Sequence, residues 1–139
     1  MIFRLKLALI FLFLPNKLMA NNIYFDEGLK LFNSEKFEEA KFKFEQNIVF
    51  NPKSEMSYLY LSKIFKNLKD KNSQEKNLNT VILLNPKNEE AIYNLAKLKL
   101  ESSDYQKSKE LNDRLNNICD KFCDQSKKLK IEIENLSKK

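Results

Sequence analysis

The triplet Asn-Pro-Lys occurs twice, at residues 51–53 and again at residues 85–87. The chain contains only one other proline and a single glycine. Proline lacks an amide N–H, and it disfavours helical backbone in the residue before it. We therefore expect helices to end near Phe50 and near Leu84, and new helices to begin shortly after each of these prolines.

The spacing of the two triplets recurs at positions that carry small residues. When the chain is shifted onto itself so that Asn51 meets Asn85, the residues Gly28, Ser62 and Ala96 fall into one column. A fixed period of about 20 to 50 residues indicates a repeat architecture, and antiparallel helices approach to about 8–9 Å only where one has a short side chain. Each unit is therefore predicted to be a helix pair, packed at this column. We expect the core to be formed by Tyr24, Leu31, Phe37, Phe44, Tyr58, Leu61, Phe65, Leu78, Ile82, Leu95, Leu98, Tyr105, Leu111 and Leu115.

A second break in each unit is expected about halfway along it. Asn, Ser and Asp, which commonly cap helices, are frequent in segments 33–37, 68–73 and 101–105. Ser103 followed by Gln106 fits a capping box, in which the two side chains bond to backbone N–H groups at the start of a helix. Asn72 with Glu75 is a looser version of the same motif.

Two stretches add a further pattern of large and small residues, with Tyr58, Leu61, Ser62 and Phe65 in one and Ala40, Phe44 and Pro52 in the other. They resemble the tetratricopeptide repeat (TPR) family, whose pattern is Trp-x2-Leu-Gly-x2-Tyr, then Ala-x3-Phe, then Pro. The resemblance implies an all-α fold: a right-handed α-solenoid of about three helix–turn–helix units, followed by a C-terminal capping helix. The units would cover 21–54, 55–88 and 89–122, and the capping helix 123–139.

The third unit departs most from the family pattern. Asp120 stands where proline is expected, and Asn112 stands where a large residue is expected. In the capping helix, Leu129, Ile133 and Leu136 share one face, and the other positions are mostly polar. Such a terminal helix keeps a short solenoid soluble.

The resemblance also implies a binding surface, because the first helix of each pair lines the concave side of a solenoid. TPR domains typically bind an extended peptide or a helix of another protein there. By repeat position, the partner-binding groove would consist of Phe25, Leu29, Phe32, Leu59, Lys63, Lys66, Tyr93 and Lys97. Each residue taken alone is better explained as core or as solvated surface, but together they favour a ligand with bulky apolar and some acidic side chains.

A subset of the family clamps the C-terminal carboxylate of its partner with Lys and Asn in the first unit. Phe25 and Leu29 stand at those positions in this chain. We therefore do not expect this docking mode.

The first twenty residues have the layout of a secretory signal peptide: two cations, an apolar run over residues 7–14, and a small residue, Ala20, before the expected cleavage point. The alternative is an uncleaved membrane anchor. Eight helical residues span about 12 Å, whereas the hydrocarbon core of a bilayer is about 30 Å thick. We therefore expect an exported protein, periplasmic or secreted, with no stable membrane insertion after cleavage.

The charge of the chain does not indicate a nucleic-acid partner. The formal charge is +6, and cleavage after Ala20 would remove Arg4, Lys6 and Lys17 and leave +3. The remaining charges are interspersed, and no stripe of basic and aromatic residues of the kind that binds nucleic acid is present. The expected partner is another protein.

Cys119 and Cys123 are the only cysteines. In an exported protein the leading interpretation is a disulfide, which would require a bend at this point and would stabilise the fold by about 2 kcal/mol at most. Free thiols are the second interpretation and a redox site is the third, since the spacing is not Cys-x-x-Cys. A zinc site is the least favoured, because the chain has no histidine.

No catalytic constellation is recognisable. Histidine, the commonest general base, is absent, and there is no glycine-rich phosphate loop and no nucleophile elbow. We predict no catalytic, cofactor-binding or metal-binding residues. The sequence favours a non-enzymatic scaffold or adaptor of the cell envelope that binds another protein. The alternatives are a thiol–disulfide participant using Cys119 and Cys123, and a membrane-tethered structural subunit if the leader is not cleaved.

Overall fold

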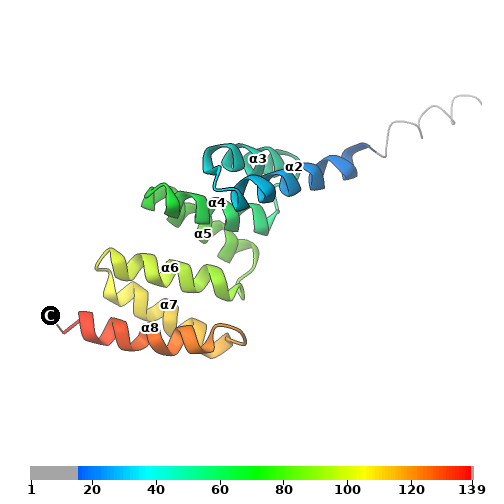
Figure 1. Ribbon diagram of the computed structural model, residues 1–139. Helices are drawn as coiled ribbons and strands as arrows, with labels where there is room; N and C mark the ends of the chain where they lie inside the picture. The colour runs from blue at the N-terminus through cyan, green and yellow to red at the C-terminus, as the bar shows by residue number, and fades with distance from the viewer. Residues whose placement is uncertain (1–15, 139) are drawn as a thin grey trace, which may run out of the picture. The chain divides into compact units, whose positions relative to one another are not determined.

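The structure, a computed structural model, describes residues 16–138, with side chains from Ile23 onward. This part of the chain is all-α and contains no strand (Figure 1). Its helices are α2 (Asn16–Asn33), α3 (Phe37–Phe50), α4 (Glu55–Asn67), α5 (Lys71–Leu84), α6 (Glu89–Glu101), α7 (Tyr105–Ile118) and α8 (Cys123–Leu136).

The helix ends predicted from the two Asn-Pro-Lys triplets are confirmed. α3 ends at Phe50 and α5 ends at Leu84, and the backbone leaves the helical region at the asparagine before each proline. The next helices, α4 and α6, begin at Glu55 and Glu89, shortly after each proline. The steric restriction that proline places on its neighbours therefore sets both boundaries.

The predicted signal peptide falls mostly outside the described residues, which begin at residue 16. α2 starts there and continues past Ala20. Cleavage after Ala20 stays a prediction. In the part of the chain that the structure describes, no helix combines the length and the apolar character that crossing a bilayer requires.

The chain divides into two compact units, the first ending at Ser57 and the second beginning at Tyr58. In the first unit, α2 and α3 form a helical hairpin (Figure 1). Gly28 lies where the two helices meet, and a Cβ atom built on it would lie 2.9 Å from Cε1 of Phe44. Ala40 and Phe44 are fully buried. The predicted close approach at the small-residue column is confirmed here.

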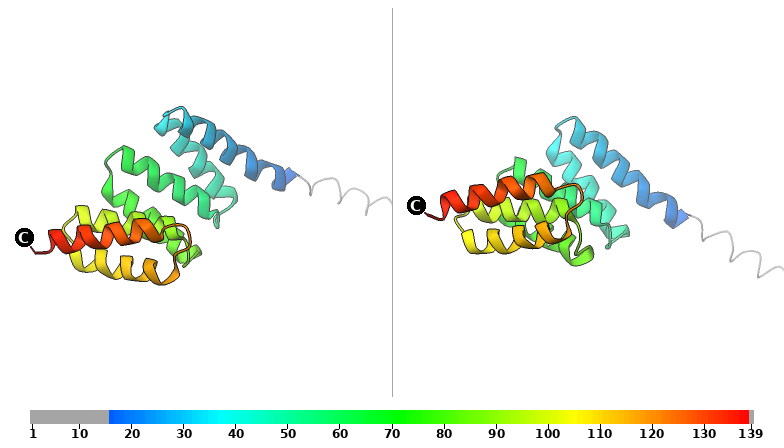
Figure 2. Two further views of the ribbon diagram at one scale, coloured as in Figure 1. Left: turned by 60° about the horizontal axis from the view of Figure 1, so that its bottom comes forward. Right: turned by 90° about the horizontal axis from the view of Figure 1, so that it is seen from below.

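The second unit contains most of α4 and the helices α5 to α8. α6, α7 and α8 lie side by side (Figure 2). The hydroxyl of Ser108 on α7 donates a hydrogen bond of 2.8 Å to the backbone carbonyl of Ala96 on α6, so the small residues again mark a close approach. The buried core comprises Leu59, Leu78, Val81, Ala91, Ile92, Leu95, Ala96, Leu98, Leu100, Leu111, Leu115, Leu129 and Ile133.

The hairpin turns share one backbone geometry that the sequence interpretation did not find. Glu35, Lys69 and Ser103, which occupy equivalent positions in the three repeats, have φ values of 59°, 59° and 61°. In each turn the N–H of the next residue donates to a carbonyl near the end of the first helix: Lys36 to Leu31, Asp70 to Phe65, and Asp104 to Lys99. This is the Schellman motif, which satisfies carbonyl groups at the end of a helix.

Both predicted capping boxes are wrong. Ser103 has the left-handed conformation just described, and Asn72 lies inside α5. The capping residues are instead Asp70 and Asp104, whose carboxylates accept hydrogen bonds from the N–H groups of Ser73 and Lys107. The turn geometry places these aspartates, rather than the nearby Ser and Asn, at the N-cap of the second helix.

Candidate functional site

Three of the predicted groove residues, Phe25, Leu29 and Phe32, lie on α2 in the first unit, and each is half-buried. The ring of Phe25 meets the ring of Phe44 edge-on, with centroids 5.5 Å apart. Phe32 meets Phe37 in the same way, at 5.7 Å. Both rings therefore help to join α2 to α3, and only part of each remains available to a ligand.

On α4 the structure separates the predicted residues. The side chain of Leu59 is 2% exposed and belongs to the core of the second unit, so it offers no surface to a ligand. Lys63 is half-buried and Lys66 is exposed. Lys63 also lies over the ring of Tyr60, with its Nζ atom 4.8 Å from the ring centroid. Tyr60 was missed by sequence reasoning, although its position three residues before Lys63 places the two side chains on the same helix face.

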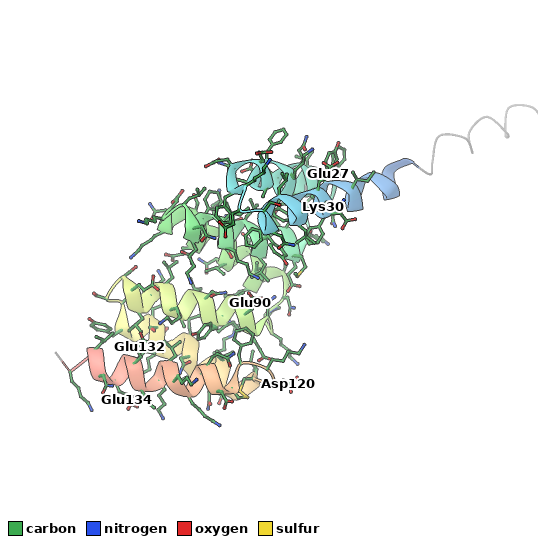
Figure 3. All side chains as sticks on the ribbon, in the orientation of Figure 1. Glu27, Lys30, Glu90, Asp120, Glu132 and Glu134 are labelled. Carbon is green, nitrogen blue, oxygen red and sulfur yellow. A yellow bond between two sulfur atoms is a disulfide. The ribbon has the colours of Figure 1, made fainter. Side chains whose placement is uncertain are left out.

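Lys63 on α4 and Lys97 on α6 are equivalent residues of neighbouring repeats, separated by the same interval as Asn51 and Asn85. Each lysine lies on the first helix of a hairpin and pairs with a carboxylate on the helix that comes directly after that hairpin. Lys63 lies 2.7 Å from Oε1 of Glu90 on α6, and Lys97 contacts both carboxylate oxygens of Glu132 on α8, at 3.1 and 3.0 Å. Figure 3 labels Glu90 and Glu132 on these helices. Glu90 and Glu132 lie far from the two lysines along the chain. No local spacing in the sequence therefore indicates these pairs.

These pairs are only partly withdrawn from solvent. The side chains of Lys63 and Glu90 are 30% and 34% exposed, and those of Lys97 and Glu132 are 27% and 46% exposed. Ion pairs at such surfaces contribute about 0–1 kcal/mol each. Breaking either pair would therefore cost little folding free energy.

Tyr93 on α6 is half-buried and packs against the core of the second unit. Its ring lies 5.6 Å from the ring of Phe122, in the loop between α7 and α8. Tyr93 therefore joins the predicted groove to the cysteine loop, which we define as residues 119–123.

The cysteine loop contains the predicted bend. α7 ends at Ile118, Cys119 has an extended backbone, and α8 begins at Cys123. The structure pairs the two cysteines through their sulfur atoms, and their Cα atoms lie 5.2 Å apart, within the range that a disulfide requires.

The carboxylate of Glu89, the first residue of α6, is bound by the cysteine loop. It accepts hydrogen bonds from three successive backbone N–H groups, those of Asp120 (3.0 Å), Lys121 (3.0 Å) and Phe122 (2.8 Å). These bonds, that from Phe122 above all, lower the pKa of Glu89. Asp120 occupies the column in which the earlier units have Pro52 and Pro86. Proline has no N–H to donate, which gives a physical reason for the departure from the repeat pattern.

The other departure, Asn112, also has a structural explanation. Asn112 is buried on α7, and its side-chain amide donates to the backbone carbonyl of Ser126 on α8, at 3.0 Å. The Ser126 hydroxyl donates in return to the backbone carbonyl of Asn112, at 3.5 Å. A large apolar residue at this position would lose the bond that aligns α8 with α7.

Within the described residues, no cluster of Cys, Asp and Glu side chains is arranged to hold a metal ion.

Comparison with known proteins identifies the fold. No protein-family model matches the chain, and no match is found among curated proteins. Solved structures do match. The TPR2B domain of yeast Sti1 in complex with pHsp70 has a TM-score of 0.78 and 15% identity over 85% of this chain and 98% of that domain. The first TPR domain of Spaghetti (RPAP3) bound to the HSP90 peptide SRMEEVD has a TM-score of 0.76 and 15% identity over 86% and 94%.

A bacterial protein has a similar structure. The Yersinia enterocolitica type III secretion chaperone SycD, in complex with a peptide of the translocator YopD, has a TM-score of 0.75 and 13% identity over 85% of this chain and 94% of that one. These similarities agree with the helix bounds, the regular spacing of the left-handed turns and the packing at the small-residue column. The chain therefore has the fold of a tetratricopeptide repeat domain.

Proposed function

We propose that this protein is a non-enzymatic scaffold or adaptor that binds a peptide or helix of another protein on the first helices of its repeats. The observation that carries the proposal is the pair of equivalent lysines, Lys63 and Lys97, each held by a partly exposed carboxylate that a ligand can replace. The peptide complexes of similar TPR domains support it, and one of those peptides, SRMEEVD, is rich in acidic residues.

The surface of the second unit suits a ligand with acidic side chains. Lys63 and Lys97 would exchange Glu90 and Glu132 for ligand carboxylates, and the exposed Lys66 would add a further positive charge. The half-buried ring of Tyr60, beside Lys63, offers apolar surface. In the first unit, the half-buried Phe25, Leu29 and Phe32 would contact bulky apolar side chains. Leu59 is not part of this proposal.

The proposed ligand is an internal peptide segment or a helix rather than a free C-terminus. Phe25 and Leu29 stand at the positions where TPR domains that clamp a terminal carboxylate have Lys and Asn. Neither side chain can bind a carboxylate. The acidic groups recognised by this chain would therefore be side chains of the partner.

Cross-linking in the native cell tests the proposal. A photoreactive amino acid at position 66, on the exposed face of α4, is expected to capture one partner protein, identified by mass spectrometry. The same amino acid at position 109, on the exposed face of α7, is the control. Equal capture from both positions would contradict the proposed surface.

Charge reversal then tests the lysines with the purified partner. Because each reversal replaces an attraction of up to about 1 kcal/mol with a repulsion of at least similar size, we expect Lys63→Glu with Lys97→Glu to raise the Kd by at least about tenfold. The matched control, Lys107→Glu with Lys109→Glu, makes the same charge change and also breaks two exposed ion pairs, those with Glu110 and Asp113. An unchanged Kd in the first variant, with the fold intact by circular dichroism, would remove the basic part of the proposal.

We propose further that the protein acts in the cell envelope, after export directed by residues 1–20, and that Cys119 and Cys123 form a disulfide there. Oxidising compartments preserve such bonds. The mass of the protein purified from its native cell tests both points, because cleavage after Ala20 removes the leader and a disulfide removes two hydrogen atoms. An uncleaved mass would favour the membrane-tethered alternative. Replacing Cys119 and Cys123 with Ser separates the scaffold from a thiol–disulfide participant: the scaffold should keep its partner binding, whereas an oxidoreductase would lose its function entirely.

A further inference from the structure

We infer that Glu89 and the cysteine loop form a redox-sensitive latch, in which the Cys119–Cys123 disulfide holds the start of α8 against the start of α6. The inference goes beyond partner binding, because it concerns how the last helix is held in place. It rests on the pairing of the two cysteines and on the three hydrogen bonds that converge on Glu89.

The convergence is the main observation. Three successive backbone N–H groups rarely point to one acceptor unless the backbone is bent into a concave arrangement, which binds anions. Here the N–H groups of residues 120–122 all bond to the Glu89 carboxylate, at 3.0, 3.0 and 2.8 Å. Hydrogen bonds to an ionised acceptor are about twice as strong as those between neutral groups. The loop is thus arranged as an anion site, and its anion is a side chain from another helix.

The disulfide fixes the ends of this arrangement. Cys119 and Cys123 flank the three donor residues, and the bond holds their Cα atoms 5.2 Å apart. Once the bond is reduced, the loop can adopt other conformations in which the N–H groups diverge. Glu89 would then lose several of its donors together, because they belong to one segment of backbone.

The start of α8 depends on this contact. Its N-cap residue, Phe122, has no side-chain hydrogen bond that caps the helix. The carboxylate of Glu89 takes that place: it accepts from the Phe122 N–H and puts a negative charge beside the positive end of the helix dipole. A loosened loop would therefore leave Asp124 as the only acidic group in the first turn of α8, while Leu129 and Ile133 continue to pack in the core.

The chemical step is ordinary thiol–disulfide exchange with a dithiol. A thiolate of the dithiol attacks one sulfur atom of the Cys119–Cys123 bond, which breaks as a mixed disulfide forms. The second thiolate of the dithiol then displaces the protein sulfur. The two cysteines gain two electrons and two protons in total and become thiols, and the dithiol is oxidised to a disulfide.

Hydrogen exchange measured by mass spectrometry on the full chain tests the latch, with dithiothreitol as the dithiol. Because reduction would release several hydrogen bonds to a charged acceptor together, we expect it to raise the exchange rates of the amides at the start of α8 by at least about tenfold. The hairpin of α2 and α3 in the same molecule is the internal control, and its exchange should not change.

Two neighbouring substitutions separate the latch from a purely local effect of the disulfide. Glu89→Gln removes the charge from the latch, whereas Glu90→Gln removes the charge of the adjacent residue, which pairs with Lys63. We expect oxidised Glu89→Gln to exchange fast at α8 already, so that reduction adds little, and Glu90→Gln to respond to reduction as the wild type does. An α8 exchange rate that is the same in oxidised and reduced wild type would overturn the inference. So would a full response to reduction in Glu89→Gln.

Discussion

At the scale of single residues, Glu35, Lys69 and Ser103 have a left-handed backbone conformation that glycine adopts more readily than other residues. For an L-residue this conformation costs about 1–2 kcal/mol. The Schellman hydrogen bonds of each turn hold the backbone there. The three turns thus keep one geometry with three chemically different side chains.

We predict that Ser103→Gly stabilises the protein. Glycine relieves the strain at φ 61° but has more backbone freedom to lose on folding, so the net gain should be about 0.5–1 kcal/mol. Urea denaturation followed by circular dichroism measures it. Ser102→Gly is the matched control: the neighbouring residue has φ −100°, so glycine should bring no gain there. A stabilising effect at residue 102 equal to that at residue 103 would contradict the explanation.

Gly28 is a second position at which the structure favours glycine. An added Cβ would lie 2.9 Å from the ring of Phe44, which is buried and also contacts Phe25, so the ring has little freedom to move. Overpacking costs about 1–3 kcal/mol, and the better helix propensity of alanine offsets about 1 kcal/mol. We therefore predict that Gly28→Ala lowers the free energy of unfolding, by up to about 2 kcal/mol.

A double substitution checks the cause of this loss. Phe44→Leu removes the ring that the new methyl group would meet, so Gly28→Ala should cost less in the Phe44→Leu background than in the wild type. Additive effects of the two changes would show that the ring is not responsible.

At the scale of the helices, the second helices of the three hairpins differ in how they begin. Asp70 caps α5 and Asp104 caps α7, each through a hydrogen bond to a backbone N–H in the first turn. The equivalent residue of α3 is Lys36, which makes no capping hydrogen bond. The backbone N–H of Ser73 also lowers the pKa of Asp70, as expected for a carboxylate that caps a helix.

We predict that Lys36→Asp stabilises the first unit. The aspartate would accept a hydrogen bond at the start of α3 and place a negative charge at the positive end of its dipole, together worth about 1 kcal/mol. Lys36→Ala serves as the control, since it removes the lysine and its weak, exposed contact with Glu39 without adding an acceptor. Hydrogen exchange of α3 reports the change locally; equal protection in both variants would exclude the cap as its cause.

At the scale of the whole molecule, the carboxyl groups with lowered pKa values, Asp70, Glu89 and Glu110, all lie in the second unit. Their causes differ: the Ser73 N–H lowers the pKa of Asp70, the N–H groups of the cysteine loop lower that of Glu89, and Lys107 lowers that of Glu110. A carboxyl group whose pKa is lowered by folding stabilises the fold above its ordinary pKa. That contribution is lost as the pH falls through the pKa of the folded state.

We therefore predict that acid destabilises the second unit, as the pH falls below the ordinary glutamate value of 4.5. Hydrogen exchange in the first and second units at a series of pH values, corrected for the intrinsic rates, measures this. Glu89→Gln does not titrate at this position and should lose less stability between neutral and acid pH than Glu90→Gln. The same pH dependence in both variants would show that Glu89 contributes nothing to acid sensitivity.

The sequence was informative where a local rule determines the structure. Proline restricts its neighbours, so the ends of α3 and α5 could be predicted, and the packing of helix pairs demands small residues, so the column of Gly28, Ser62 and Ala96 could be interpreted. The left-handed turns were missed because glycine, the usual signal, is absent from them. Three contacts join segments that are far apart in the chain, so no spacing rule predicts them. They are the pairs Lys63–Glu90 and Lys97–Glu132 and the contact of Glu89 with the cysteine loop.

The backbone bonds of the hairpin turns have a consequence for how such proteins evolve. A turn held by main-chain groups tolerates Glu, Lys or Ser at its tightest point, and a helix contact that requires only a small residue accepts Gly, Ser or Ala. Many substitutions at these positions are therefore compatible with an unchanged repeat length. Two chains can therefore share this architecture with few identical residues, as the 13–15% identity at TM-scores of 0.75–0.78 illustrates.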